Sequence, residues 1–148
     1  MAKLTDTDSL IQAHAYRLTR VSRLLRRSLI SELSRLEIGL SPEQYFLVWR
    51  LHERDGRVQG ELVDPLMDDR PNITRLLDGL AKKGLVERRR DPEDGRRWRV
   101  FLTAAGRALV ERLLPEVVTL RHQLLGGISE ADLAALERVM DHLESVLA

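Results

Sequence analysis

The chain has 148 residues, enough for one domain with a hydrophobic core, and 43% of its residues are apolar although only 4% are aromatic. It contains no cysteine, which excludes disulfides, thiolate zinc sites and thiol-based redox switches. The N-terminal residues lack an apolar signal region, and no apolar run approaches the roughly 18 residues of a membrane span, so we expect a cytoplasmic protein.

Charge is unevenly distributed along the chain. The 24 basic residues nearly balance the 23 acidic ones, for a net charge of +1. The segment from Arg70 to Arg107 nevertheless carries 11 basic and 5 acidic residues, a net of +6, while the rest of the chain has 13 basic and 18 acidic residues. A basic segment on an otherwise acidic chain is typical of a protein that binds nucleic acid.

Apolar spacing predicts a first helix over residues 8–36, with an apolar face made of Leu18, Val21, Leu25, Leu29, Leu33 and Leu36. The opposite face is either solvated or makes additional phosphate contacts, and it carries Arg17, Arg20, Arg23 and Arg27. A second helix is expected to begin with Ser41 as the N-cap and Pro42 in the first turn, and to end at Asp55 and Gly56.

A short extended piece and a weak helix over residues 61–67 follow, and Pro65 limits the length of that helix. Asp68 or Asp69 can cap the next helix, which Gly84 is placed to end in the left-handed conformation. Helical spacing turns four apolar side chains toward the core, Ile73, Leu76, Leu77 and Leu80. The outward side is left with Asn72, Arg75, Asp78, Gly79 and Lys82.

Two basic strands are predicted next, over residues 85–90 and 97–102, on either side of a strong turn signal over residues 91–95. We interpret them as a two-stranded hairpin with a basic outer face. Trp98 lies on the other face with two aliphatic neighbours. It is either a core residue at the base of the hairpin or a group that stacks on bases.

The remaining chain predicts two further helices, separated by Gly126 and Gly127. The first has Thr103 as its N-cap, and the second repeats apolar residues over two heptads. Such a repeat suits packing of one helix against another. Together, these elements predict a mainly α fold with a small β-hairpin.

A helix, a short connector, a second helix and a basic hairpin follow one another in the order of a winged helix-turn-helix. An α-helix fits the roughly 12 Å wide major groove of DNA, and its N-terminal outward residues reach base edges. Asn72, Thr74 and Arg75 occupy those positions. Asn can pair with adenine and Arg with guanine, at roughly 1–3 kcal/mol of discrimination for each good pair. Arg70 and Lys82, near the two ends of this helix, complete the predicted set of DNA contacts.

The hairpin is then a wing whose arginines can enter the narrower minor groove, where the negative potential is strongest. Arg96 and Arg97 directly follow the turn and are best placed for this, and Arg99 lies on the same basic face. Asp94 can hold an arginine by a charge-assisted hydrogen bond. The first strand ends in three consecutive residues that are either phosphate contacts or a solvated strand end, Arg88, Arg89 and Arg90.

A resemblance to a known family rests on three stretches: N-I-T-R-L-L-D-G-L-A-K-K-G-L-V-E-R, D-P-E-D-G-R-R and L-T-A-A-G-R. Together they resemble the multiple-antibiotic-resistance regulator (MarR) family of bacterial transcription regulators. The resemblance implies dimerisation helices over residues 8–36 and 104–148 and a DNA-binding lobe over residues 41–103, within one domain. It also implies that Asp94 and Arg96 carry the family's Asp-any-Arg wing pattern.

This family tends to bind small phenolic or aromatic effectors between its dimerisation helices and its DNA-binding lobe. The resemblance therefore implies an effector pocket lined by Arg17, Tyr45, Trp49 and His52, although ordinary packing would explain the same residues. The four histidines of the chain show no i, i+4 pairing, so we expect no metal site and no cofactor.

The expected function is that of a sequence-specific regulator that binds double-stranded DNA, acting as a homodimeric repressor at a pseudo-palindromic operator and released by a small aromatic ligand. An enzyme is not expected, because no catalytic carboxylate pair, Gly-rich phosphate loop or Ser/His/Asp arrangement stands out. The alternative is a winged helix used only for protein–protein contact, because a fold does not determine a function. The concentration of basic charge on the helix and hairpin favours DNA.

Overall fold

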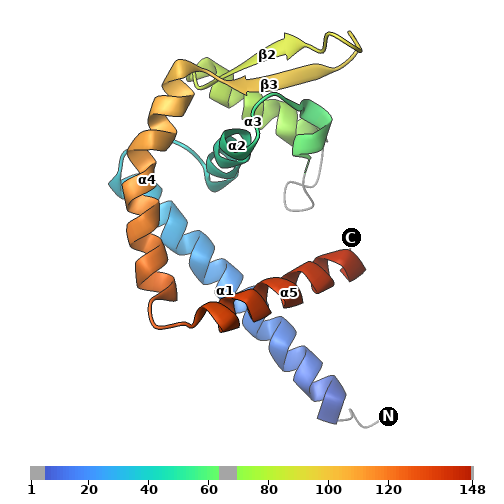
Figure 1. Cartoon of the computed structure of the whole chain (residues 1–148), viewed down its shortest axis with the longest axis vertical. Coiled ribbons are helices and arrows are strands. Elements are labelled where there is room, and N and C mark those ends of the chain that lie inside the picture. The colour runs from blue at the N-terminus through green and yellow to red at the C-terminus, as the bar shows by residue number, and fades with distance from the viewer. Residues whose placement is uncertain (1–5, 64–69, 148) are drawn as a thin grey trace. The chain divides into compact units, whose positions relative to one another are not determined.

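The computed structural model describes residues 6–63 and 70–147. Within them the elements are, in chain order, α1 (Asp6–Arg35), α2 (Pro42–Glu53), β1 (Arg57–Val58), the 3-10 helix η1 (Gln59–Leu62), α3 (Arg70–Lys82), β2 (Val86–Arg90), β3 (Trp98–Leu102), α4 (Ala104–Leu125) and α5 (Glu130–Leu147) (Figure 1). The predicted fold, mainly α with a small β part, is confirmed. The chain divides into two compact units, Met1–Phe46 and Leu47–Ala148, with the boundary inside α2. The single domain expected from the sequence stays a prediction.

The first unit consists of α1 and the beginning of α2. The connection between them passes through left-handed backbone at Glu37 (φ 52°) and Gly39 (φ 67°). Ser41 caps α2 as predicted, because its Oγ accepts the N–H of Gln44 at 3.2 Å. In return the Gln44 side chain accepts the N–H of Ser41 at 3.3 Å. This reciprocal pair is a capping box, and it determines where α2 begins.

The second unit is built around aliphatic side chains from α2, η1, α3, the sheet and α4. The fully buried ones include Leu47, Val48, Leu51, Leu62, Ile73, Leu77, Leu80, Val100, Leu102 and Val110. Three of the four α3 residues predicted to face the core are among them, and the fourth, Leu76, is half-buried. α3 therefore buries one face and exposes the other, as its spacing predicts.

The sheet has three antiparallel strands in the order β1-β3-β2, so the prediction of a two-stranded hairpin is incomplete. β1 is the short extended piece expected after the second helix, and it pairs Arg57 with Val100 of β3. A strand of two residues has no alternation of its own, so only its partner strand identifies it.

Asp55 and Gly56 hold this third strand in place. The Asp55 carboxylate accepts the N–H of Leu102 on β3 at 2.9 Å and pairs with Arg107 of α4, also at 2.9 Å. Gly56 adopts a φ of 71°, and a Cβ there would lie 2.7 Å from the Phe101 ring. The residues predicted only to end α2 therefore also join that helix to the sheet.

The weak helix predicted over residues 61–67 is wrong in the part that the structure describes. The 3-10 helix spans Gln59–Leu62, and Val63 is already extended. The buried Leu62 side chain explains this short turn, because packing in the core overrides a weak local propensity. Residues 64–69, with Pro65 and the predicted caps Asp68 and Asp69, lie outside the described residues.

Gly84 ends α3 in the left-handed conformation, with a φ of 70°, as predicted. Its N–H donates to the carbonyl of Ala81 at 2.9 Å, and the N–H of Leu85 donates to the carbonyl of Leu80 at 3.0 Å. These are the two bonds of a Schellman motif, which releases the chain into β2 at a defined angle.

Thr103 begins α4, also as predicted. Its Oγ accepts the N–H of Gly106 at 3.0 Å and donates to the carbonyl of Gly84 at 2.6 Å. A Cβ on Gly106 would lie 2.2 Å from the carbonyl oxygen of Leu85, so the first turn of α4 can approach β2 only with glycine at this position. The stretch L-T-A-A-G-R thus joins the end of the hairpin to α4.

Candidate nucleic-acid interface

α3 and the β2–β3 hairpin form one surface of the second unit (Figure 1). The solvent face of α3 exposes Thr74, Arg75, Asp78 and Lys82. The hairpin runs back along α3, and its turn extends past the helix (Figure 1). A helix and a projecting basic hairpin are thus presented together on one unit, in the arrangement that groove binding requires.

Two of the predicted base-reading residues are hydrogen-bonded to each other. Arg75 Nη2 donates to Asn72 Oδ1 at 2.9 Å, which orients both side chains in the absence of DNA. Lys82 lies in the last turn of α3, where the helix dipole favours a cation. The backbone of Arg70 begins α3, but its side chain lies outside the described residues. The roles of these four residues in DNA binding stay predictions.

Gln59 joins this surface from η1. Its Nε2 donates to Thr74 Oγ1 at 3.0 Å, so the third predicted base-reading residue contacts a side chain from another element. A glutamine amide can make two hydrogen bonds to adenine, which makes Gln59 a further candidate for base contact. Gln59 was not predicted from the sequence, because its position depends on the 3-10 helix and not on any local motif.

The arginines at the end of β2 differ in their surroundings. Arg88 pairs with Asp78 of α3 at 2.7 Å and donates to the Thr74 carbonyl at 3.1 Å, and its side chain is 23% exposed. Arg89 pairs with Glu87 on the same strand, and both Arg89 and Arg90 are exposed. The predicted phosphate contact therefore suits Arg89 and Arg90 better than Arg88, which joins the hairpin to α3.

Asp91 organises the turn between β2 and β3, and it is only 5% exposed. Its carboxylate accepts the N–H groups of Glu93 at 2.9 Å and Asp94 at 3.4 Å. The hydrogen bond from Glu93 is the largest influence on the pKa of Asp91 and outweighs the opposing effect of burial, so this pKa lies below its ordinary value of 3.8. From the sequence, Asp91 was predicted only as part of the turn.

Arg99 is the partner of Asp91 inside the sheet. Its Nε lies 2.9 Å from Asp91 Oδ2, and its Nη1 donates to the Gly56 carbonyl at 3.0 Å. Arg99 therefore links the turn to Gly56, the residue before β1. This structural role was not predicted from the sequence. Its predicted contact with DNA is untested.

Asp94 pairs with an arginine as predicted, and that arginine is Arg97, with Nε and Oδ2 3.2 Å apart. The other carboxylate oxygen accepts the backbone N–H of Arg96 at 3.0 Å. No hydrogen bond or ion pair to the Arg96 side chain is found within residues 6–63 and 70–147. The turn thus exposes the guanidinium of Arg96 to a ligand.

The interpretation of Trp98 as a core residue at the base of the hairpin is wrong. Trp98 is 38% exposed and lies opposite Arg90 at the turn end of β3. Its neighbours on the same face, Val100 and Leu102, are buried. The strand face is continuous, but the core beneath it ends before Trp98, and alternation along a strand cannot show where a core ends.

The residues of the predicted effector pocket fall in both units. Tyr45 packs edge-on against Phe46, and Trp49 packs edge-on against His52, with ring centroids 5.6 Å apart in each pair. Arg17 lies on an exposed part of α1. These contacts agree with ordinary packing, and the pocket itself stays a prediction.

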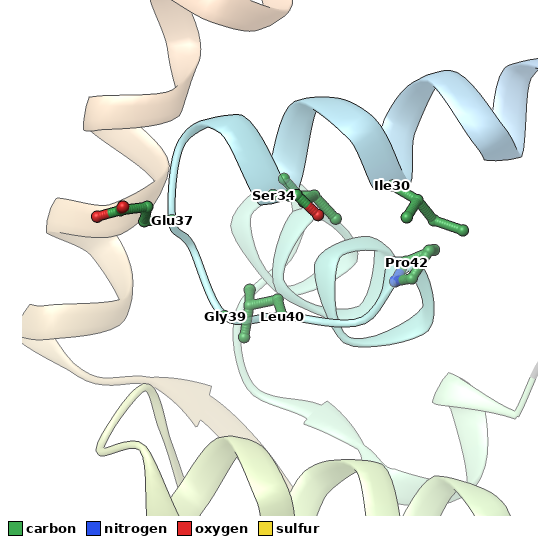
Figure 2. Close-up of a pocket in the computed structure, with 7 residues that line it drawn as sticks. Ile30, Ser34, Glu37, Gly39, Leu40 and Pro42 are labelled. Carbon is green, nitrogen blue, oxygen red and sulfur yellow. The ribbon is translucent and has the colours of Figure 1, made fainter.

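The first unit contains a hollow of about 330 Å³ near the connection between α1 and α2 (Figure 2). It is lined by Ile30, Leu33, Ser34, Glu37, Gly39, Leu40 and Pro42, and by none of the four predicted pocket residues. Ile30 of α1 and Pro42 at the start of α2 lie at one end of it, and Glu37 lies at the other (Figure 2). Its volume is at the lower end of the range for small-molecule sites.

Within residues 6–63 and 70–147, no group of three or more histidine, aspartate or glutamate side chains could hold a metal ion. None of the helices in this part of the chain is both long enough and apolar enough to cross a membrane.

Known proteins similar to this chain are transcriptional regulators. The MarR family model matches residues 40–98, which include α2, α3 and the hairpin turn. An uncharacterized HTH-type transcriptional regulator of Bacillus subtilis, YdgJ, is 31% identical over 107 residues, which cover 72% of this chain and 65% of that protein. The transcriptional regulator HosA of Escherichia coli is 28% identical over 90 residues, which cover 61% of this chain and 67% of HosA. The match thus spans slightly less than two thirds of the B. subtilis relative.

Solved structures show the same fold over nearly the whole chain. The S. aureus MepR structure in its DNA-binding conformation matches with a TM-score of 0.81 at 24% identity, covering 91% of this chain and 98% of MepR. A MarR transcriptional regulator from Methanosarcina mazei matches with a TM-score of 0.77 at 25% identity, covering 90% of this chain and 99% of that one. MarR proteins are transcription regulators and not enzymes. The chain therefore has the winged helix fold of MarR regulators, and its residues 40–98 match the MarR family model.

Proposed function

We propose that the chain is a homodimeric repressor that binds a pseudo-palindromic site in double-stranded DNA with sequence specificity. The observation that carries this proposal is the exposed basic surface made of α3 and the hairpin, on a lobe whose other helix face is buried in the core. The relation to MepR supports it, because that protein has been solved in complex with DNA. The cytoplasmic location expected from the sequence stays a prediction.

The surface divides into residues suited to base readout and residues suited to backbone contact. Asn72, Thr74 and Arg75 would reach base edges in the major groove from the first turns of α3. Arg96 would enter the flanking minor groove, and Arg89 and Arg90 would contact phosphates. The first group determines the sequence that is bound, and the second supplies affinity for any duplex.

The dimer is supported by α1 and α5, which both leave apolar residues exposed. Leu18 and Val21 of α1 are 49% and 51% exposed, and α5 buries none of its residues. The charges of the two helices are opposite: residues 9–31 hold five arginines and no acidic residue, while α5 holds five acidic residues and one arginine. We infer that α1 of one copy packs against α5 of a second copy. A two-fold dimer would place half-sites about one helical turn, roughly 34–36 Å, apart.

The dimer can be tested separately from DNA binding. Val139→Glu places a charge on the apolar face of α5, where Val139 is 55% exposed. Light scattering should give the mass of a dimer for the unaltered chain and the mass of a monomer for the variant. Arg138→Gln, its neighbour on the same helix, changes the net charge by the same one unit and controls for that change. A monomeric unaltered chain at micromolar concentration would contradict the dimer.

The third part of the proposal is that a small aromatic ligand releases the DNA. The hollow of about 330 Å³ is large enough for a single ring, with Ile30 and Leu40 as apolar walls and Ser34 as a polar group. A ligand in this hollow would release DNA only if it bound more tightly to a form of the dimer in which the spacing of the two copies of α3 does not match that of the two half-sites. Leu40→Trp, which fills the hollow, should abolish release without preventing DNA binding.

DNA binding is tested by fluorescence anisotropy over a salt series, with the duplex upstream of the protein's own gene and a scrambled duplex. Specific binding that weakens steeply with salt supports the proposal, because each neutralised phosphate contributes a slope of about −0.9 in log affinity against log salt. Equal binding of both duplexes would require selection of a site from a random duplex library. If no duplex binds even at low salt, the protein–protein alternative replaces the regulator.

A further inference from the structure

We propose that Arg90 and Trp98 form a positioning pair that holds the turn of the wing and thereby presents Arg96 to the minor groove. The proposal rests on the proposed function, because Arg96 is assumed to contact DNA. It assigns to Trp98 a role that is neither core packing nor base stacking.

The pair closes the turn end of the hairpin. Arg90 is the last residue of β2 and faces Trp98, the first residue of β3, in the strand register. The Arg90 guanidinium carbon lies 4.0 Å from the centroid of the Trp98 ring, which is the distance of a cation–π stack. In addition, Arg90 Nη1 donates to the carbonyl oxygen of Gly95 at 2.8 Å. The stack therefore orients a guanidinium that in turn holds the residue directly before Arg96.

Asp91 and Arg99 form a second set of contacts, which holds the beginning of the turn. The Asp91 carboxylate accepts two backbone N–H groups of the turn and pairs with Arg99, which donates to the Gly56 carbonyl. Asp91 is buried, so it fixes the beginning of the turn. Gly95 lies at its far end, where Arg90 supplies the contact described above.

These contacts fix the backbone directly before the Arg96 side chain. Asp94 accepts its backbone N–H, and Arg90 holds the carbonyl that precedes it, so the peptide between Gly95 and Arg96 is fixed at both of its polar atoms. The Arg96 side chain itself has no partner in the described residues. A free side chain on a fixed backbone loses less conformational freedom on binding than one on a flexible turn. Removing the pair should therefore weaken DNA binding through Arg96.

Arg89 and Phe101 provide a matched control within the same hairpin. The Arg89 guanidinium carbon lies 4.7 Å from the Phe101 ring centroid, so this is a second stacked arginine one position earlier in the chain. Neighbouring residues on a strand point to opposite faces, and no hydrogen bond joins Arg89 to the turn among the described residues. Arg89→Ala and Arg90→Ala thus remove the same charge and the same kind of stack, but only Arg90→Ala releases Gly95.

The first test is a double-mutant cycle on DNA affinity, with the duplex that the unaltered protein selects from a random library. Trp98→Ala leaves the charge unchanged and should weaken binding about three- to fivefold, while Trp98→Phe should retain most of the affinity. In an Arg96→Ala background Trp98→Ala should have almost no effect, and Arg90→Ala should have only the effect of its lost charge. Arg89→Ala should weaken binding by the same factor with or without Arg96, because independent contacts are additive.

The second test needs no DNA. Trypsin cleaves after arginine, so the rate of cleavage between Arg96 and Arg97 reports how often the turn opens. Trp98→Ala should raise that rate severalfold in the folded protein, and Arg89→Ala should leave it unchanged. Circular dichroism confirms that each variant is folded before it is compared.

The outcomes separate this inference from the proposed function. If Trp98→Ala weakens DNA binding equally with and without Arg96, Trp98 acts directly on DNA and the positioning role is overturned. If cleavage at the turn does not change, the pair does not hold the turn and the inference also fails. If the turn opens as expected but the unaltered protein binds no duplex, the pair exists and the proposed function is what fails.

Discussion

α3, the proposed recognition helix, and the β2–β3 hairpin, the proposed wing, both carry exposed basic residues, but these residues differ in their ion pairs. α3 is held by the buried side chains of Ile73, Leu77 and Leu80. Its basic residues Arg75 and Lys82 form no ion pair within residues 6–63 and 70–147. In the hairpin, by contrast, Arg88, Arg97 and Arg99 each pair with an acidic side chain. Among the described residues the apolar core ends before the turn of the hairpin, so charged side chains, including the buried Asp91, maintain the shape of the turn.

This difference affects how substitutions are interpreted. On α3 the residues that stabilise the fold and those proposed to bind DNA lie on opposite faces, so the two roles can be altered separately. On the hairpin the two roles fall on neighbouring arginines, and sometimes on one. Substitutions on the two elements should therefore differ in their effects on stability and on DNA binding.

The largest effect is expected at the buried face of α3. Leu77→Ala should lower the free energy of unfolding by about 2–5 kcal/mol, because it leaves a cavity beside fully buried leucines. Urea denaturation measures this loss, and Arg75→Ala, on the exposed face, should change stability by less than about 0.5 kcal/mol. Equal losses for the two variants would remove the distinction between the faces.

Arg75→Ala should instead affect sequence recognition. The loss of one good contact to guanine costs roughly 1–3 kcal/mol, so specific affinity should fall about tenfold or more. Binding to a scrambled duplex should change much less. Competition anisotropy with the two duplexes gives both values, and a parallel decline would assign Arg75 to the phosphate backbone.

Within the wing, Arg96→Ala and Arg99→Ala should separate binding from structure. Arg96→Ala should weaken binding of all sequences severalfold and reduce the salt slope by about 0.9, without lowering the melting temperature. Arg99→Ala should weaken binding and also lower the melting temperature, because it leaves buried Asp91 without its charged partner. If Arg99→Ala leaves the melting temperature unchanged, the ion pairs do not maintain the shape of the wing.

The smallest effect is a dependence of stability on acid pH. Hydrogen bonding holds the pKa of Asp91 below 3.8, so its ionised form stabilises the folded wing. That contribution is complete above the ordinary pKa and is lost as the pH falls through the lower folded value. The stability difference between the unaltered chain and Asp91→Asn should therefore be constant from pH 7 to about 4 and shrink below that. Thermal unfolding across this range measures it, and a difference that shrinks already near pH 6 would point to another group.

Features that depend on neighbours along the chain could be predicted from the amino-acid sequence. The cap at Ser41 and the end of α3 at Gly84 each follow from a few adjacent residues, because helix ends are satisfied locally. The buried face of α3 follows from a repeat of 3.6 residues, and the basic segment is a matter of counting charges. These features, with three short motifs, were sufficient to predict the family and the location of the candidate interface.

The partner of each arginine, by contrast, depends on long-range packing and is known from the fold alone. Arg88 is hydrogen-bonded to Asp78, ten residues away in the sequence, and Arg99 to Asp91, eight residues away. The Asp55 carboxylate accepts the N–H of Leu102, which lies 47 residues away in the sequence. The same kind of long-range contact places Gln59 beside Thr74, and the limit of the core leaves Trp98 exposed under Arg90. The sequence shows many similar arginines but not their partners, because the choice of partner depends on how strands and helices pack, which no local pattern records.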